Sequence, residues 1–122
     1  MRPLPRLLAI TDDEIVTSED FPIRAAAIAA SGPPVAIVVR APATTDAARL
    51  RHLDRVRALT RPPEASVVGH GDPAAARLAG AQGVQLRRSD LTVSDARAVF
   101  ADVWSGVSVH TVDEARAARD QG

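Results

Sequence analysis

The 122-residue chain contains no cysteine, no lysine and no tyrosine. The absence of cysteine excludes disulfide bonds, thiolate metal sites and cysteine nucleophiles. Every basic residue is arginine, which neither forms a Schiff base nor titrates near neutrality, so lysine-dependent aldolases and pyridoxal enzymes are excluded as well. Any acid–base chemistry must therefore depend on histidine, carboxylates, serine or threonine.

The chain also lacks a surplus of charge and a long hydrophobic run. Its 15 basic and 15 acidic residues cancel, which gives no indication of a polyanionic partner such as a nucleic acid. No stretch approaches the roughly 18 apolar residues of a membrane span, and the apolar run near the N-terminus is too short for a signal peptide. The sequence predicts one cytoplasmic domain that binds neither nucleic acid nor membrane, and a hydrophobic content of 46% is enough for a core.

Five short apolar runs alternate with helical patterns, which predicts parallel strands joined by right-handed crossovers in an α/β fold. Asp72-Pro73 is typical of a helix start and Gly80 of a helix end, and proline-rich connections at 32–34 and 61–63 would lead into strands. We expect strands at residues 7–10, 35–39, 65–68, 83–86 and 106–109, and helices at about 22–31, at about 45–60, from about 73, and after the fourth and fifth strands.

Two architectures can accommodate five such units. A doubly wound domain of the flavodoxin or response-regulator type suits the length, whereas a (β/α)8 barrel normally needs about 200–250 residues. The acidic pair Asp12-Asp13 imitates a response regulator, but that fold also requires an aspartate after the third strand and a lysine after the fifth. The chain has His70 and His110 there, so the response-regulator alternative fails.

Polar residues follow the predicted strands at the edge where, in either architecture, the carboxyl ends of the strands converge. The mixture of cations, imidazoles and carboxylates suits an anionic, phosphorylated ligand. Asp12 and Asp13 can be interpreted equally well as site residues or as turn residues. Arg87 and Arg88 are interpreted as solvated loop charges. The predicted site comprises Thr11, Arg40, His70, Gln85, Asp90, Ser108 and His110.

His110 stands where the fifth predicted strand meets a helix. Thr111 and Glu114 have the spacing of a capping box, in which each side chain accepts a hydrogen bond from a backbone amide at the helix start. The positive end of the helix dipole disfavours an imidazolium cation at this point. A neutral imidazole at a strand end can act as a base, so His110 is the predicted catalytic residue.

Taken in order, these residues resemble the thiamine phosphate synthase family, including its thiazole tautomerase branch. The family opens with Leu-x-x-Ile-Thr-Asp, matched by residues 7–12, and its fourth strand reads Gly-Val-His-Leu-Gly-Gln-x-Asp-Leu, similar to Gly-Val-Gln-Leu-Arg-Arg-Ser-Asp-Leu at 83–91. Residues 106–115 match the family's Gly-x-Ser-x-His-[Ser/Thr]-x-x-Glu-Ala in full. The resemblance implies a (β/α)8 TIM barrel that is incomplete here: residues 1–122 would form about five βα units with parallel strands in sequential order.

The departures from the family pattern concern its metal and pyrophosphate. The family's second strand ends in Gln-Leu-Arg-x-Lys, and Pro42 replaces the pyrophosphate-binding lysine here. In the synthases an Asn-Asp pair follows the third strand, and its aspartate holds magnesium together with the aspartate matched by Asp90; His70 and Gly71 stand at those positions here. The resemblance thus implies Mg²⁺ as cofactor with Asp90 as one ligand, but the second carboxylate is missing. Gln85, in place of the family's histidine, also occurs in the tautomerase branch, which this chain resembles better.

The resemblance also implies a role for each site residue. His110 would transfer a proton on a phosphorylated thiazole, whereas a synthase would couple thiazole phosphate with a pyrimidine pyrophosphate. The residues implied in substrate binding are Arg40, Ser108, Gln85, His70 and Thr11.

The family's sixth strand and its later phosphate-binding glycine loops have no counterpart in this sequence. Two hypotheses therefore stay open: an enzyme of thiamine thiazole metabolism, or a degenerate relative that binds a phosphorylated metabolite or a protein partner without catalysis. An open barrel segment would leave its first and fifth strands unpaired, so we expect low stability and association of copies through these edges.

Overall fold

The computed structural model describes residues 2–61 and 64–122, in which five parallel strands form one curled sheet. The register is continuous across the sheet: Val38 pairs with Val68, Val68 with Gly83, and Gly83 with Trp104. This sequential order confirms the open barrel segment and excludes the doubly wound sheet, in which the first strand would lie inside the order. The strands, in spatial order, are β1 (Leu7–Ile10), β2 (Val35–Val39), β3 (Ser66–His70), β4 (Gly83–Leu86) and β5 (Trp104–Val107).

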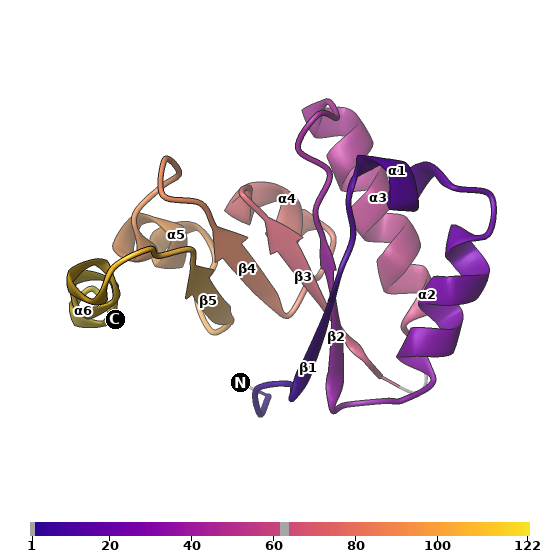
Figure 1. Ribbon diagram of the computed structural model, residues 1–122, viewed down its shortest axis with the longest axis horizontal. Coiled ribbons are helices and arrows are strands. Elements are labelled where there is room, and N and C mark those ends of the chain that lie inside the picture. The colour runs from indigo at the N-terminus through magenta and orange to yellow at the C-terminus, as the bar shows by residue number, and fades with distance from the viewer. Residues whose placement is uncertain (1, 62–63) are drawn as a thin grey trace.

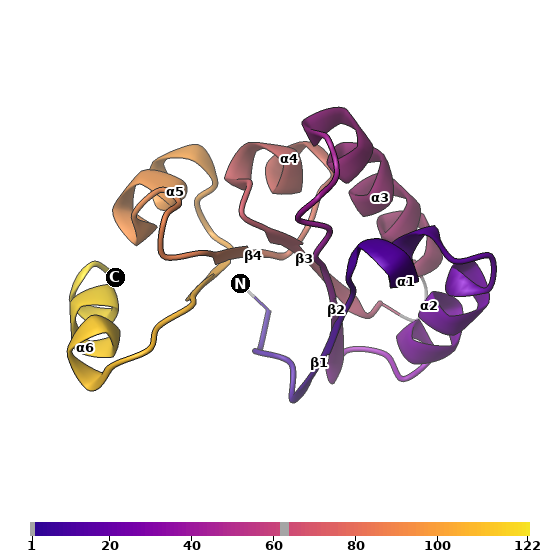
Figure 2. The same cartoon turned by 45° about the horizontal axis from the view of Figure 1, so that its top comes forward.

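The helices form an arc around the convex side of the sheet (Figures 1 and 2). Five of those in the described residues start at an aspartate or threonine whose side chain accepts a hydrogen bond from the amide three residues later, as at Asp72 and Ala75. The predicted helix start at Asp72-Pro73 is thereby confirmed. The helices are α1 (Asp13–Thr17), α2 (Phe21–Ala29), α3 (Asp46–Leu59), α4 (Pro73–Leu78), α5 (Val93–Val99) and α6 (Val112–Asp120).

Apolar side chains cover both faces of the middle of the sheet. On the convex side Ile37 and Val67 belong to one buried cluster with Leu53 and Val56 of α3. On the concave side a smaller cluster joins four residues from three strands: Ala36, Val38, Val68 and Trp104. Because β2 is buried on both faces, its sequence is a continuous apolar run rather than an alternating one.

The N-terminal segment lies on the concave side of the sheet (Figure 2). The indole Nε1–H of Trp104 donates to the carbonyl oxygen of Arg2 at 2.9 Å, and the Arg2 guanidinium donates to the Ser66 hydroxyl at 3.0 Å. Ser66 and Trp104 are the first residues of β3 and β5. The segment therefore crosses the amino-terminal ends of the strands, opposite the edge at which the predicted site lies.

Three details differ from the sequence-based expectation. His70 is the last residue of β3 rather than a residue after it, and β5 starts at Trp104, two residues earlier than expected, because Trp104 pairs with Gly83. The short helix α1 was not expected, since its acidic start fitted a turn equally well. Two residues of the predicted 61–63 connection, 62 and 63, lie outside the described part of the chain.

The first strand presents apolar side chains to solvent. Leu8 and Ile10 are 52% and 59% exposed, although their register partners Ala36 and Val38 are buried in the concave cluster. Such an edge has unpaired backbone groups as well as apolar surface, and both favour association of copies through it. That association stays a prediction. Within residues 2–61 and 64–122, no helix has the length and apolar character that a membrane crossing requires.

Candidate functional site

An open hollow lies at the carboxyl ends of the strands. Its volume of about 660 Å³ falls within the range of small-molecule sites, roughly 300–1,000 Å³. Four residues predicted from the sequence, which come from three separate strand ends, are brought together there. The hollow, called the strand-end hollow below, is lined by Arg40, His70, Arg87, Arg88, Ser89, Ser108 and His110.

Thr11 is not among the lining residues of the hollow but fixes the backbone of Arg40. The Thr11 hydroxyl donates to the Arg40 carbonyl oxygen at 2.8 Å and accepts from the Arg40 amide at 2.9 Å. Thr11 is only 5% exposed. These two bonds tie the end of β1 to the end of β2, so Thr11 orients the arginine through its main chain.

Gln85 joins the ends of β3, β4 and β5. It pairs in register with His70 on one side and with Gly106 on the other. Its amide Nε2 donates to the Ser108 hydroxyl at 3.2 Å, and a side chain at position 106 would overlap the Gln85 amide. Glycine at 106 therefore allows Gln85 to reach Ser108 and to orient its hydroxyl.

The main chain at His110 is held by the start of α6. The Glu114 amide donates to the Thr111 hydroxyl at 3.1 Å, and the Glu114 carboxylate accepts from the His110 amide at 2.7 Å. The predicted capping box is thus present, with the carboxylate one residue further back than usual. The bond from the His110 amide, helped by the nearby Arg88 guanidinium, lowers the pKa of Glu114 even though desolvation opposes it. The His110 side chain is exposed at the rim of the hollow.

The Asp90 carboxylate is engaged by Arg87. It accepts from the Arg87 amide at 2.6 Å, from Nε at 3.0 Å and from Nη2 at 2.8 Å. Partial burial raises the pKa of Asp90, but the hydrogen bonds and charge of Arg87 outweigh it and hold that pKa below its ordinary value. Across residues 2–61 and 64–122, no three carboxylate, histidine or cysteine side chains are grouped as metal ligands. A carboxylate already paired with a guanidinium, next to glycine at 71, does not fit the magnesium site that the family resemblance implies.

His70 faces a positive environment. Burial of its ring, followed by the charges of Arg40 and Arg87, lowers the pKa of His70 below 6.5; Arg49 acts in the same direction, and Asp90 opposes it. The folded chain therefore favours a neutral imidazole at this position.

His70 should make stability depend on pH. In the unfolded chain a histidine gains its proton near pH 6.5, whereas His70 in the folded chain gains it only at a lower pH. Because the unfolded state then binds more protons, the free energy of unfolding decreases as the pH falls from 6.5 toward the folded pKa of His70. We expect an NMR titration of the His70 ring to have its midpoint below 6.5. The pKa of His52 is also lowered, mainly by burial of its ring, so His52 contributes to the same pH dependence. The contribution of His70 is therefore isolated by comparing the unmodified chain with His70→Gln, which should lose less stability over this pH interval. An equal loss in both proteins would contradict the assignment.

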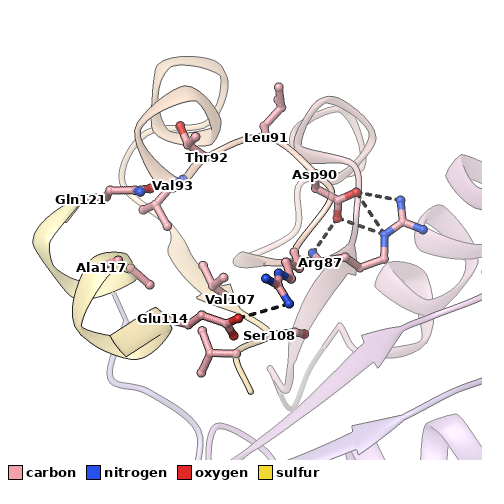
Figure 3. Close-up of a pocket in the computed structure, with 13 residues that line it drawn as sticks. Arg87, Asp90, Leu91, Thr92, Val93, Val107, Ser108, Glu114, Ala117 and Gln121 are labelled. Atoms are coloured by element: carbon pink, nitrogen blue, oxygen red, sulfur yellow. Dashed lines mark hydrogen bonds and ion pairs between the residues drawn. The ribbon is translucent and has the colours of Figure 1, made fainter. Parts of the chain in front are cut away.

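A second, narrower hollow adjoins the first on the helix side of β5 (Figure 3). Val93, Val107 and Ala118 contribute apolar surface, and the Gln121 side chain accepts from the Val93 amide at 3.3 Å. This space separates α5 from α6, which has no buried residue of its own. The loop that carries Arg87, Arg88 and Asp90 forms the wall between the two hollows.

Sequence reasoning gave too little weight to Arg87. It was interpreted as a solvated loop charge, whereas its side chain is fixed by Asp90 and lines the strand-end hollow. The available signal was the spacing of Arg87 and Asp90, three residues apart directly after a strand. Arg88 fits the original interpretation better, because its side chain is 72% exposed and pairs with Glu114 at 3.2 Å.

Comparisons with known proteins agree with this geometry. The sequence model described as thiamine monophosphate synthase matches residues 7–122. A solved structure of thiamine phosphate pyrophosphorylase from Pyrococcus furiosus superposes with a TM-score of 0.79 at 25% sequence identity, over 96% of this chain and 56% of that one. The chain thus spans little more than half the length of the solved relative. No curated protein sequence matches this chain.

Proposed function

This chain belongs to the thiamine monophosphate synthase family, and on that premise we propose that it binds a phosphorylated thiazole in the strand-end hollow and isomerises it by proton transfer. The observation that carries the proposal is the hollow itself, which combines the Arg40 cation with the imidazole of His110 at converging strand ends. Isomerisation needs only that a proton leave one position of the substrate and return at another. An imidazole suits this task because it can both accept and donate a proton near neutral pH.

The remaining residues have positioning roles in this proposal. Ser108, oriented by Gln85, would hydrogen-bond the thiazole ring, and Arg40 would meet its carboxylate or phosphate. The neutral imidazole of His70, which lines the same hollow as Arg40 and Ser108, would add a further hydrogen-bonding group. Coupling with a pyrimidine pyrophosphate is less well supported, because Asp90 is paired with Arg87 and glycine occupies position 71.

The test is conversion of a thiazole carboxylate phosphate to its isomer, followed by NMR with magnesium and with a chelator. We expect conversion under both conditions. We expect Asp90→Ala to keep turnover without any magnesium requirement and to weaken only ligand binding, because Asp90 orients Arg87. Coupling activity that needs magnesium and is abolished by Asp90→Ala would favour the synthase instead. Saturable binding without either reaction would favour the non-catalytic relative.

Arg40→Ala should weaken ligand binding and leave turnover at saturation largely unchanged. The change removes a cation from the hollow, and the loss of one charge-assisted hydrogen bond corresponds to roughly ten- to a hundredfold in Kd. Calorimetric titration with the thiazole phosphate measures this directly. Arg51→Ala, on the exposed side of α3, is the control and should bind like the unmodified chain. An unchanged Kd for Arg40→Ala would remove Arg40 from the site.

A further inference from the structure

The pairing of Arg87 with Asp90 suggests what replaces a metal in this hollow. We infer that Arg87 is the resident cation of the strand-end hollow, and that its guanidinium binds the anionic group of the ligand directly, without a divalent metal ion. The inference rests on the proposed function only for the identity of the natural ligand. The geometry of Arg87 and Asp90 is drawn in Figure 3.

Asp90 fixes the guanidinium in one orientation. Both Nε and Nη2 of Arg87 donate to the carboxylate, at 3.0 Å and 2.8 Å, in the two-point geometry that arginine forms with planar anions. The Asp90 side chain is only 8% exposed, whereas that of Arg87 is 47% exposed. Within the described part of the chain Nη1 of Arg87 donates no hydrogen bond, so one edge of the fork is free to meet a ligand.

Gly71 provides the space that the guanidinium occupies. A Cβ atom at position 71 would lie 3.2 Å from both Nε and Nη2 of Arg87, and the backbone φ of +78° is one that side-chain-bearing residues rarely adopt. The position at which the family resemblance implies a second carboxylate is thus taken by an arginine that reaches across from the next strand end. A metal ion at Asp90 would have to displace this guanidinium, so the cation and the metal are mutually exclusive.

Arginine side chains line the strand-end hollow, and no carboxylate is among its lining residues in the described part of the chain. The two carboxylates beside it, Asp90 and Glu114, are each paired with an arginine. Arg40 forms no ion pair with any residue in 2–61 or 64–122. Arg40 and Arg87 both line the strand-end hollow, together with His70. Two convergent guanidinium groups suit a phosphate ester or a pyrophosphate.

The first test uses the unmodified chain and inorganic pyrophosphate, with no thiazole present. Isothermal titration is carried out in a chelating buffer and again with excess magnesium. We expect saturable binding in the chelator that magnesium does not strengthen, because the anion's partner is already part of the protein. Binding that requires magnesium, or no binding under either condition, would overturn the inference.

Variants then assign the binding to Arg87. Arg87→Ala should weaken pyrophosphate binding roughly ten- to a hundredfold, and Arg87→Lys, which keeps the charge but not the two-point pairing, should give an intermediate Kd. Arg119→Ala removes another arginine that is paired with an aspartate, Asp120, outside the hollow, and should change nothing. Wild-type affinity in both Arg87 variants would contradict the inference. If the unmodified chain binds pyrophosphate without magnesium but does not isomerise the thiazole phosphate, the proposed function is contradicted and the inference about Arg87 is not.

Discussion

Replacing His110 by alanine is expected to lower the rate of thiazole isomerisation about 10²- to 10⁴-fold, the usual contribution of a positioned acid–base group. The backbone at His110 is held through its amide by Glu114, so the loss of the imidazole leaves the hydrogen-bonded frame of the hollow in place. Turnover should fall while Kd for the thiazole phosphate changes little. The measurement is the NMR conversion assay together with a calorimetric titration.

His52→Ala is the matched control for His110. His52 lies on α3 and does not line the strand-end hollow, so its removal should leave turnover unchanged. Equal activity of His110→Ala and the unmodified chain would show that the proton is transferred by another group. A loss of binding as large as the loss of turnover would make His110 a ligand-binding residue instead.

Replacing Leu53 by alanine is expected to destabilise the fold by about 2–5 kcal/mol. Leu53 is fully buried in the cluster between α3 and the sheet, where its Cδ2 atom faces Gly69 of β3. Because glycine adds no side chain there, the space left by the leucine has little to fill it. Urea denaturation followed by circular dichroism gives the change in the free energy of unfolding.

Leu78→Ala makes the same chemical change at a position that is 75% exposed on α4. It should alter the free energy of unfolding by no more than about 0.5 kcal/mol. A similar loss in the two variants would mean that the cluster around Leu53 does not dominate the stability of this chain.

The architecture was accessible from the sequence because local and global signals agree. The continuous apolar run of β2, the Asp72-Pro73 helix start and the Thr111–Glu114 spacing each predicted an element that the structure contains. The order of the strands was not a local property. Length favoured a doubly wound sheet, and only the resemblance of the ordered motifs to a barrel family favoured the sequential order.

The site was accessible only as a set of positions. Counting residues after each strand identified Arg40, Ser108 and His110 as neighbours, since parallel strands end at one edge. Spacing could not predict that the Thr11 hydroxyl would form both of its hydrogen bonds with the backbone of Arg40, because those residues are 29 apart in sequence. The pairing of Arg87 with Asp90 was within reach of the sequence, but its meaning depends on the space left by Gly71. The lack of a magnesium requirement, the cytoplasmic location and the association of copies stay predictions.

The central claim is that a phosphorylated thiazole binds at the carboxyl ends of the strands, and an NMR titration of the ¹⁵N-labelled chain with that ligand tests it most directly. We predict saturable shifts concentrated at the strand-end hollow, with Arg40, His70, Ser108 and His110 among the residues most affected. Residues at the opposite end of the sheet, such as Ser66 beside Arg2, should not respond. Shifts confined to that opposite end, or no saturable shift at all, would contradict the account.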